Sequence, residues 1–199
     1  MSKLIVKMMA AGALAVTGAT VLPVATADQA SCGTANCTTG NVPVNFSIAI
    51  PAVLRLQVGA VGATAQVDWT AAAITATNVG NGTAVNADSV ANGGAGAGLV
   101  AYSLVSNISN NNATITATGS GAAFDAGGGN TIPYTAVNAT AVPILGAAVA
   151  LPVPGTPTTV SPVGGLILRT GTWQYNYVNT TIYAAGTYTG TINYTANQP

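Results

Sequence analysis

Apolar residues occupy every second position over a long stretch near the N-terminus. The stretch covers residues 42–58, and its alternating apolar residues are Val42, Val44, Phe46, Ile48, Ile50, Leu54, Leu56 and Val58. Successive side chains of a β-strand point to opposite faces of the sheet, so this period predicts a strand with one apolar face. Pro51 cannot donate a ladder hydrogen bond, and we expect it to mark a bend, a bulge or an edge position between two halves of the strand.

Shorter strand patterns recur along the rest of the chain. They cover residues 74–77, 99–105, 114–118, 134–137, 143–149, 166–177 and 187–195. Clusters of Asn and Gly separate them, including Asn81-Gly82, 110–112 and 127–130, and such clusters are typical of turns. No segment after residue 27 has a helical period. The sequence therefore predicts an all-β fold, and a β-sandwich is favoured over a β-solenoid because no fixed repeat is found.

The first 27 residues have the composition of a cleavable secretory signal peptide. Lys3 and Lys7 precede an apolar run, and Ala25-Thr26-Ala27 form a small-residue cleavage site. We expect the mature chain to be secreted and to act outside the cell or at the cell surface. The later apolar run at 141–154 contains three prolines, so we expect an extended, partly buried connection or edge strand there and no transmembrane helix.

The two cysteines are close together, at Cys32 and Cys37. An even number of cysteines in an exported chain predicts a disulfide, whereas a metal site would need ligands beyond two thiols. The expected organisation is a signal peptide at 1–27, an N-terminal segment with a small disulfide loop at 28–41, and a single β-sandwich domain at 42–199.

Charge almost disappears after residue 27, where Lys, Glu and His are absent. The remaining charged residues are Asp28, Arg55, Asp68, Asp88, Asp125 and Arg169. General acid–base catalysis needs a titratable group near neutral pH, and His-based triads and metal sites need residues that this chain lacks. We therefore predict no enzymatic activity, no cofactor and no metal site. Nucleic acid is not an expected partner either, because its binding depends on Lys and Arg.

A nearly neutral surface offers little electrostatic repulsion between copies of the chain. This gives the alternating residues Val42, Val44, Phe46, Ile48 and Ile50 two possible uses. They can be the first strand of their own sandwich, or a strand added to the sheet of another subunit. The sequence pattern is the same in both cases, and the two interpretations stay open.

A candidate aromatic surface suggests a function of a different class. Its residues are Trp69, Trp173, Tyr175 and Tyr177, and Trp69 follows Asp68 directly. Exposed aromatic rings of this kind would suit a monomeric extracellular module that binds a glycan or another surface polymer.

The closing segment 184–195, with the sequence AAGTYTGTINYT, carries a family resemblance. It resembles the last strand of secreted bacterial β-sandwich subunits, namely spore-coat-U-like proteins and chaperone–usher pilins. The resemblance implies an immunoglobulin-like antiparallel β-sandwich that a neighbouring subunit's strand completes. It also implies copies of the chain itself as partners, together with an export chaperone or outer-membrane assembly machinery. The leading hypothesis is an exported structural subunit of an extracellular fibre or pilus-like surface assembly.

Overall fold

The computed structural model describes residues 30–96, 98–108 and 110–199. The predicted signal peptide at 1–27 lies outside the described residues. One compact unit covers Ile50–Pro199, and it begins later than the domain start expected at residue 42. Its strands pair in antiparallel fashion, and its one 3-10 turn among the described residues is Tyr134–Ala136. The predicted all-β fold is confirmed.

The larger sheet is built around one long central strand, β11 (Ile167–Tyr177). On one side β11 pairs with β5 (Leu99–Ser106), which in turn pairs with the edge strand β1 (Leu54–Val58). On its other side β11 pairs with the edge strand β9 (Val137–Leu145). The short strand β3 (Val85–Asn86) pairs with the last two residues of β11 on the β5 side, beyond the end of the β5 pairing. Both of its edges are therefore hydrogen-bonded along most of its length.

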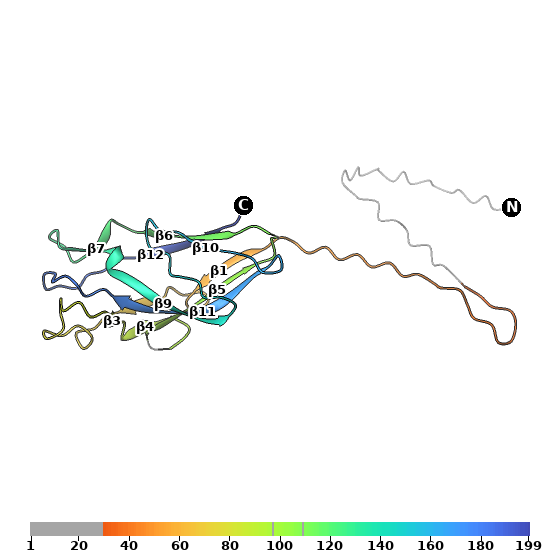
Figure 1. The fold of residues 1–199 in the computed structure, drawn as a ribbon, viewed down its shortest axis with the longest axis horizontal. Coiled ribbons are helices and arrows are strands. Elements are labelled where there is room, and N and C mark those ends of the chain that lie inside the picture. Colours follow the sequence, from red (N-terminus) through yellow and green to blue (C-terminus); the bar gives the residue numbers. More distant parts are fainter. Residues whose placement is uncertain (1–29, 97, 109) are drawn as a thin grey trace, which may run out of the picture. The chain divides into compact units, whose positions relative to one another are not determined.

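The smaller sheet has three strands in the order β10 (Thr158–Val160), β6 (Ala113–Gly119) and β12 (Ile192–Asn197). The two sheets form two layers (Figure 1). Two short pairs complete the unit: β2 (Gln66–Asp68) with β4 (Ser89–Ala91), and β7 (Ala123–Asp125) with β8 (Thr131–Pro133).

The two sheets share one hydrophobic core. The larger sheet contributes Val100, Tyr102, Leu104, Ile167 and Trp173, and the smaller sheet contributes Ala113, Ile115 and Val160. These residues follow the period of two that each strand's sequence shows, with the residues between them less buried along β5. One apolar face per sheet thus explains how the core forms.

Trp173 lies at the centre of this core with none of its surface exposed. Its ring stacks on Tyr102 with 4.7 Å between ring centroids, and its Nε1–H donates to the Val149 carbonyl at 2.8 Å. The Val149 N–H donates to the Tyr102 hydroxyl at 3.1 Å. Gly171 permits this arrangement, because a Cβ there would lie 2.5 Å from the Tyr102 hydroxyl. Two core aromatics therefore hold Val149, a residue of the connection between β9 and β10.

Several strand predictions are confirmed, at 54–58, 99–105, 114–118 and 166–177. The segment 141–154 is an edge strand followed by a partly buried connection, as expected.

Four strand predictions are wrong, wholly or in part. Of the strand predicted at 143–149, only 143–145 belong to a strand, the end of β9. Residues 74–77 form turns, because the Asn78 side chain bonds the Thr75 N–H and the Ala73 carbonyl and so replaces strand partners. Residues 134–136 form the 3-10 turn, and β9 begins at Val137. The last strand begins only at Ile192, since the Tyr188 hydroxyl donates to the Ala184 carbonyl within a loop.

Candidate functional site

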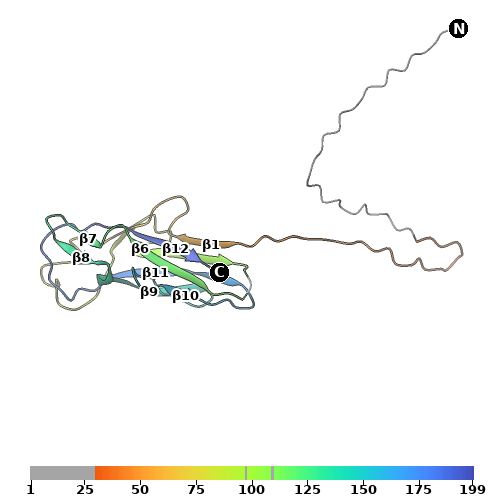
Figure 2. The same ribbon diagram turned by 90° about the horizontal axis from the view of Figure 1, so that it is seen from above.

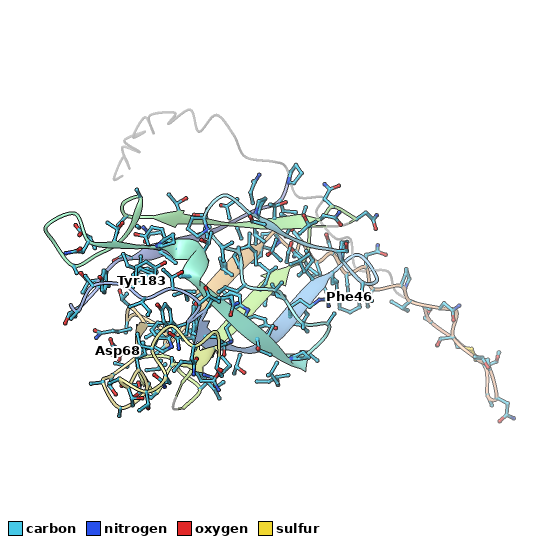
Figure 3. All side chains as sticks on the ribbon, turned by 60° about the vertical axis from the view of Figure 1, so that its left-hand side comes forward. Phe46, Asp68 and Tyr183 are labelled. Carbon is cyan, nitrogen blue, oxygen red and sulfur yellow. A yellow bond between two sulfur atoms is a disulfide. The ribbon has the colours of Figure 1, made fainter. Side chains whose placement is uncertain are left out.

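The alternating segment 42–50 is the most unusual surface of the described chain. It belongs to no strand, and all five of its alternating apolar residues are exposed: Val42, Val44, Phe46, Ile48 and Ile50. Phe46 is 87% exposed and Ile48 is 85% exposed; Figure 3 labels Phe46 on this segment. Scattered exposed apolar residues are normal, but a continuous apolar row marks an interaction surface. The predicted strand therefore divides at Pro51, with only 54–58 paired inside the domain.

The segment that precedes this row carries the predicted disulfide. Cys32 and Cys37 are bonded, and their Cα atoms are 6.2 Å apart, within the usual range for a disulfide. The bond closes a small loop, with turns at 34–36 and Asn36 at a positive φ of 65°. The loop lies in the N-terminal part of the chain, before the compact unit.

The junction between the apolar row and β1 is fixed by one side chain, that of Asn107. The Val53 N–H donates to Asn107 Oδ1 at 2.6 Å, and Asn107 Nδ2 donates to the Pro51 carbonyl at 2.8 Å. The Asn107 N–H also donates to the Val53 carbonyl at 3.2 Å. These bonds continue the antiparallel pairing of β1 with β5 beyond Leu54 and Ser106. Residues 51–53 are thus held in line with β1 by the end of β5.

The predicted aromatic surface is largely inside the molecule, and this part of the prediction is wrong. Trp173, Tyr175 and Tyr177 are buried, because β11 is the central strand and its odd-numbered side chains face the core. Trp69 is partly buried, and its Nε1–H donates to the Val85 carbonyl at 2.8 Å. Trp69 is the only one of these four residues that is not buried.

The carboxylates of the domain bond to nearby backbone and side-chain donors. Asp68 accepts from Gln66 Nε2 at 3.0 Å, and Asp125 accepts from the Gly127 N–H at 2.7 Å. Asp88 accepts from both the hydroxyl and the N–H of Thr70, which lowers the pKa of its carboxyl. The Asp125 bond stabilises a local turn, the Asp68 bond lies within β2, and the Asp88 bonds join residues 18 positions apart.

The two arginines have different surroundings. Arg55 is exposed on β1, whereas Arg169 is buried and donates to the carbonyls of Ser161 and Leu168 at 3.0 and 3.2 Å. Arg169 thereby ties β11 to the residues after β10. Among the described residues, no three His, Cys, Asp or Glu side chains lie close enough together to hold a metal ion. In the same part of the chain, no helix has the length and apolar character needed to cross a membrane.

Two tyrosines, Tyr175, which is buried, and Tyr194, which is partly buried, join the sheets. The hydroxyls of Tyr175 on β11 and Tyr194 on β12 are 3.2 Å apart. Burial raises the pKa of both phenols above its usual value, and the neighbouring Tyr194 raises the pKa of Tyr175 further. Ionisation of either hydroxyl in the folded domain is therefore disfavoured.

We expect this pair to make the domain sensitive to alkaline pH alone. A phenol whose folded pKa is raised stabilises the fold below its unfolded pKa of about 10, and this stability is lost as pH rises above that value. Thermal unfolding should therefore change little from pH 5 to 9 and shift to lower temperature above about pH 10. A Tyr175→Phe, Tyr194→Phe variant should show a smaller alkaline shift. An equal alkaline shift in parent and variant would contradict this assignment.

Asn107 and Val149 are structural residues that the sequence pattern did not indicate. Both act through partners far along the chain, 54 residues away for the Asn107–Val53 bond and 47 for the Val149–Tyr102 bond. Local periodicity carries no signal for such pairs. No protein-family model matches the chain, and no significantly similar curated protein or solved structure is found.

Proposed function

We propose that the chain is an exported structural subunit of an extracellular fibre or pilus-like surface assembly. In this proposal the domain is an immunoglobulin-like antiparallel β-sandwich, and copies are joined when residues 42–50 of one copy add as a strand to a sheet of another. The observation that carries the proposal is the exposed apolar row Val42, Val44, Phe46, Ile48 and Ile50, which has strand period and no strand partner among the described residues.

The driving force for such addition is burial of this row. Fully burying a Val, Ile or Phe side chain is worth about 1.5–3 kcal/mol relative to leaving it exposed. Added strands also gain main-chain hydrogen bonds, and pockets for alternate side chains give the pairing its register. Pro43 is the second residue of this segment, and a proline so close to the end of an edge strand interrupts its hydrogen-bond ladder little.

The small number of charged residues also supports assembly. Between residues 38 and 54 the sequence contains no charged side chain, so burying the segment desolvates no ion. Assembly should accordingly depend little on salt. The glycan-binding alternative has less support, because three of its four aromatic residues lie in the core.

The test compares two pairs of acidic substitutions in the same segment. Phe46→Asp with Ile48→Asp places carboxylates on the apolar row, where assembly would bury them without partners at a cost of several kcal/mol. Asn45→Asp with Ser47→Asp adds the same charge to the opposite face and serves as the matched control. We expect the first variant to remain monomeric and the control to form fibres, as seen by electron microscopy and sedimentation of purified mature protein.

Two results would count against the proposal. One is a parent protein that stays monomeric at high concentration. The other is a first variant that assembles as well as its control, because the apolar row would then play no part in the contact.

A further inference from the structure

The two open sides of the domain differ in how their strand edges are protected. On one side lie β9 and β10, the edge strands at matching ends of the two sheets. β9 contains Pro143, and β10 is only three residues long and stands between Pro157 and Pro162. Short strands and prolines are the usual means of preventing an edge from pairing with another chain.

Residues of the connection between β9 and β10 also fill the core on this side. The connection from β9 to β10 places Val149 in the core, 2% exposed, where Tyr102 and Trp173 bond its backbone N–H and carbonyl. Pro152 of the same connection is also fully buried. Strand addition is therefore blocked on the β9 and β10 side of the domain.

The opposite side, between β1 and β12, lacks these protections. The two strands lie next to each other, as Figure 2 shows, but they belong to different sheets. Neither sequence, LRLQV or INYTAN, contains proline. An open hollow of about 610 Å³ lies against β1 and is lined by residues 55–58 of that strand and by residues 60–64 of the following loop, with no β12 residue in its lining.

The core-facing residues of these two edge strands are incompletely covered. They are Leu54, Leu56 and Val58 on β1, and Ile192, Tyr194 and Ala196 on β12, and all six are only partly buried. Their neighbours on the inner strands, such as Leu104 at 0% and Ile115 at 1%, are fully buried. One more strand with a single apolar face would cover these partly buried residues, and residues 42–50 have that pattern.

The chain's own segment precedes β1 in the sequence, separated from it only by residues 51–53. To pair with its own β1, the segment would have to reverse direction within residues 51–53. Asn107 bonds both the Pro51 carbonyl and the backbone of Val53, and so holds these residues in line with β1. A reversal would break three hydrogen bonds and leave the Asn107 amide without them. The occupant is thereby expected to come from a second copy.

We propose that residues 42–50 of one copy add along the open side of a second copy, at the unpaired edges of β1 and β12, and that Asn107 keeps this addition intermolecular. The proposal rests on the proposed function and names the acceptor for the same segment. Charged side chains do not oppose this contact. The added segment is uncharged, and Arg55 is the one charged residue on β1 and β12 and lies on the face of β1 away from the core.

The test uses cysteine pairs on exposed positions, with the native Cys32–Cys37 disulfide retained. Ser47→Cys lies on the polar face of the segment, and Thr195→Cys lies on the exposed face of β12. The matched control combines Ser47→Cys with Thr140→Cys on the exposed face of β9. Each variant must first match the parent protein in thermal unfolding. Each assembled protein is then treated with a short thiol-specific cross-linker, and the products are separated under denaturing conditions.

We expect a ladder of covalent oligomers from the β12 pair, Ser47→Cys with Thr195→Cys. We expect no such ladder from the β9 pair, Ser47→Cys with Thr140→Cys. A ladder from the β9 pair would contradict the assignment of β1 and β12 as the acceptor strands, while leaving strand addition itself intact. A cross-linked monomer from the β12 pair would overturn the second-copy occupant. Fibres without either cross-link would overturn addition of the segment, and a parent protein that never assembles would overturn the proposed function itself.

Discussion

A mature chain shortened to begin at Ile50 is expected to fold as a stable monomer and to lose assembly completely. The compact unit covers Ile50–Pro199, and the strand pairs and core cluster lie within it. The Asn107 bonds to Pro51 and Val53 are retained. Thermal unfolding should therefore stay close to that of the full mature chain under conditions where the latter is monomeric, while electron microscopy should show no fibres.

A synthetic peptide covering residues 41–51 provides the control for this truncation. If the segment acts as an added strand, the peptide should bind the shortened domain and raise its unfolding temperature as peptide concentration increases, because a ligand that binds only the folded state stabilises it by mass action. The peptide with Phe46→Asp and Ile48→Asp should not. A shortened chain that is unfolded without peptide would instead make residues 42–50 an intrinsic strand of their own domain.

The Trp173→Ala variant is expected to lose about 3–5 kcal/mol of unfolding free energy, the range for removing a large aromatic side chain from a core. The indole is fully buried, stacks on Tyr102 and lies 5.7 Å from the Tyr194 ring centroid. Its loss also leaves the Val149 carbonyl without its donor. Since domains of this size are stable by only about 5–15 kcal/mol, the variant should be marginally folded in urea titrations.

Trp173→Phe separates packing from hydrogen bonding at this position. Phenylalanine keeps an aromatic ring against Tyr102 but cannot donate to the Val149 carbonyl. We expect an intermediate loss, of which about 1–3 kcal/mol reflects the unpaired buried carbonyl. If Trp173→Ala cost less than about 1 kcal/mol, the placement of this residue at the centre of the core would be wrong.

The fold class follows from local patterns that the sequence displays directly. Alternation over 99–105 and 166–177 predicts strands because a period of two permits one apolar face, and the structure has β5 and β11 there. The Asn and Gly clusters at 110–112 and 127–130 predict turns for an equally local reason, their tolerance of positive φ, which Asn110 and Gly127–Gly129 adopt. The pairing of Cys32 with Cys37 is also a local matter.

The sequence by itself determined that this protein is an all-β chain with an uncharged, alternating apolar segment near its N-terminus. Only the tertiary structure decided that 54–58 is paired while 42–50 is exposed, and that Trp173, Tyr175 and Tyr177 are core residues rather than a surface. The physical reason is that a period of two shows that a strand has two different faces. Which neighbour covers each face, and whether any does, depends on contacts between residues far apart in the chain, such as Asn107 with Val53 and Trp173 with Val149.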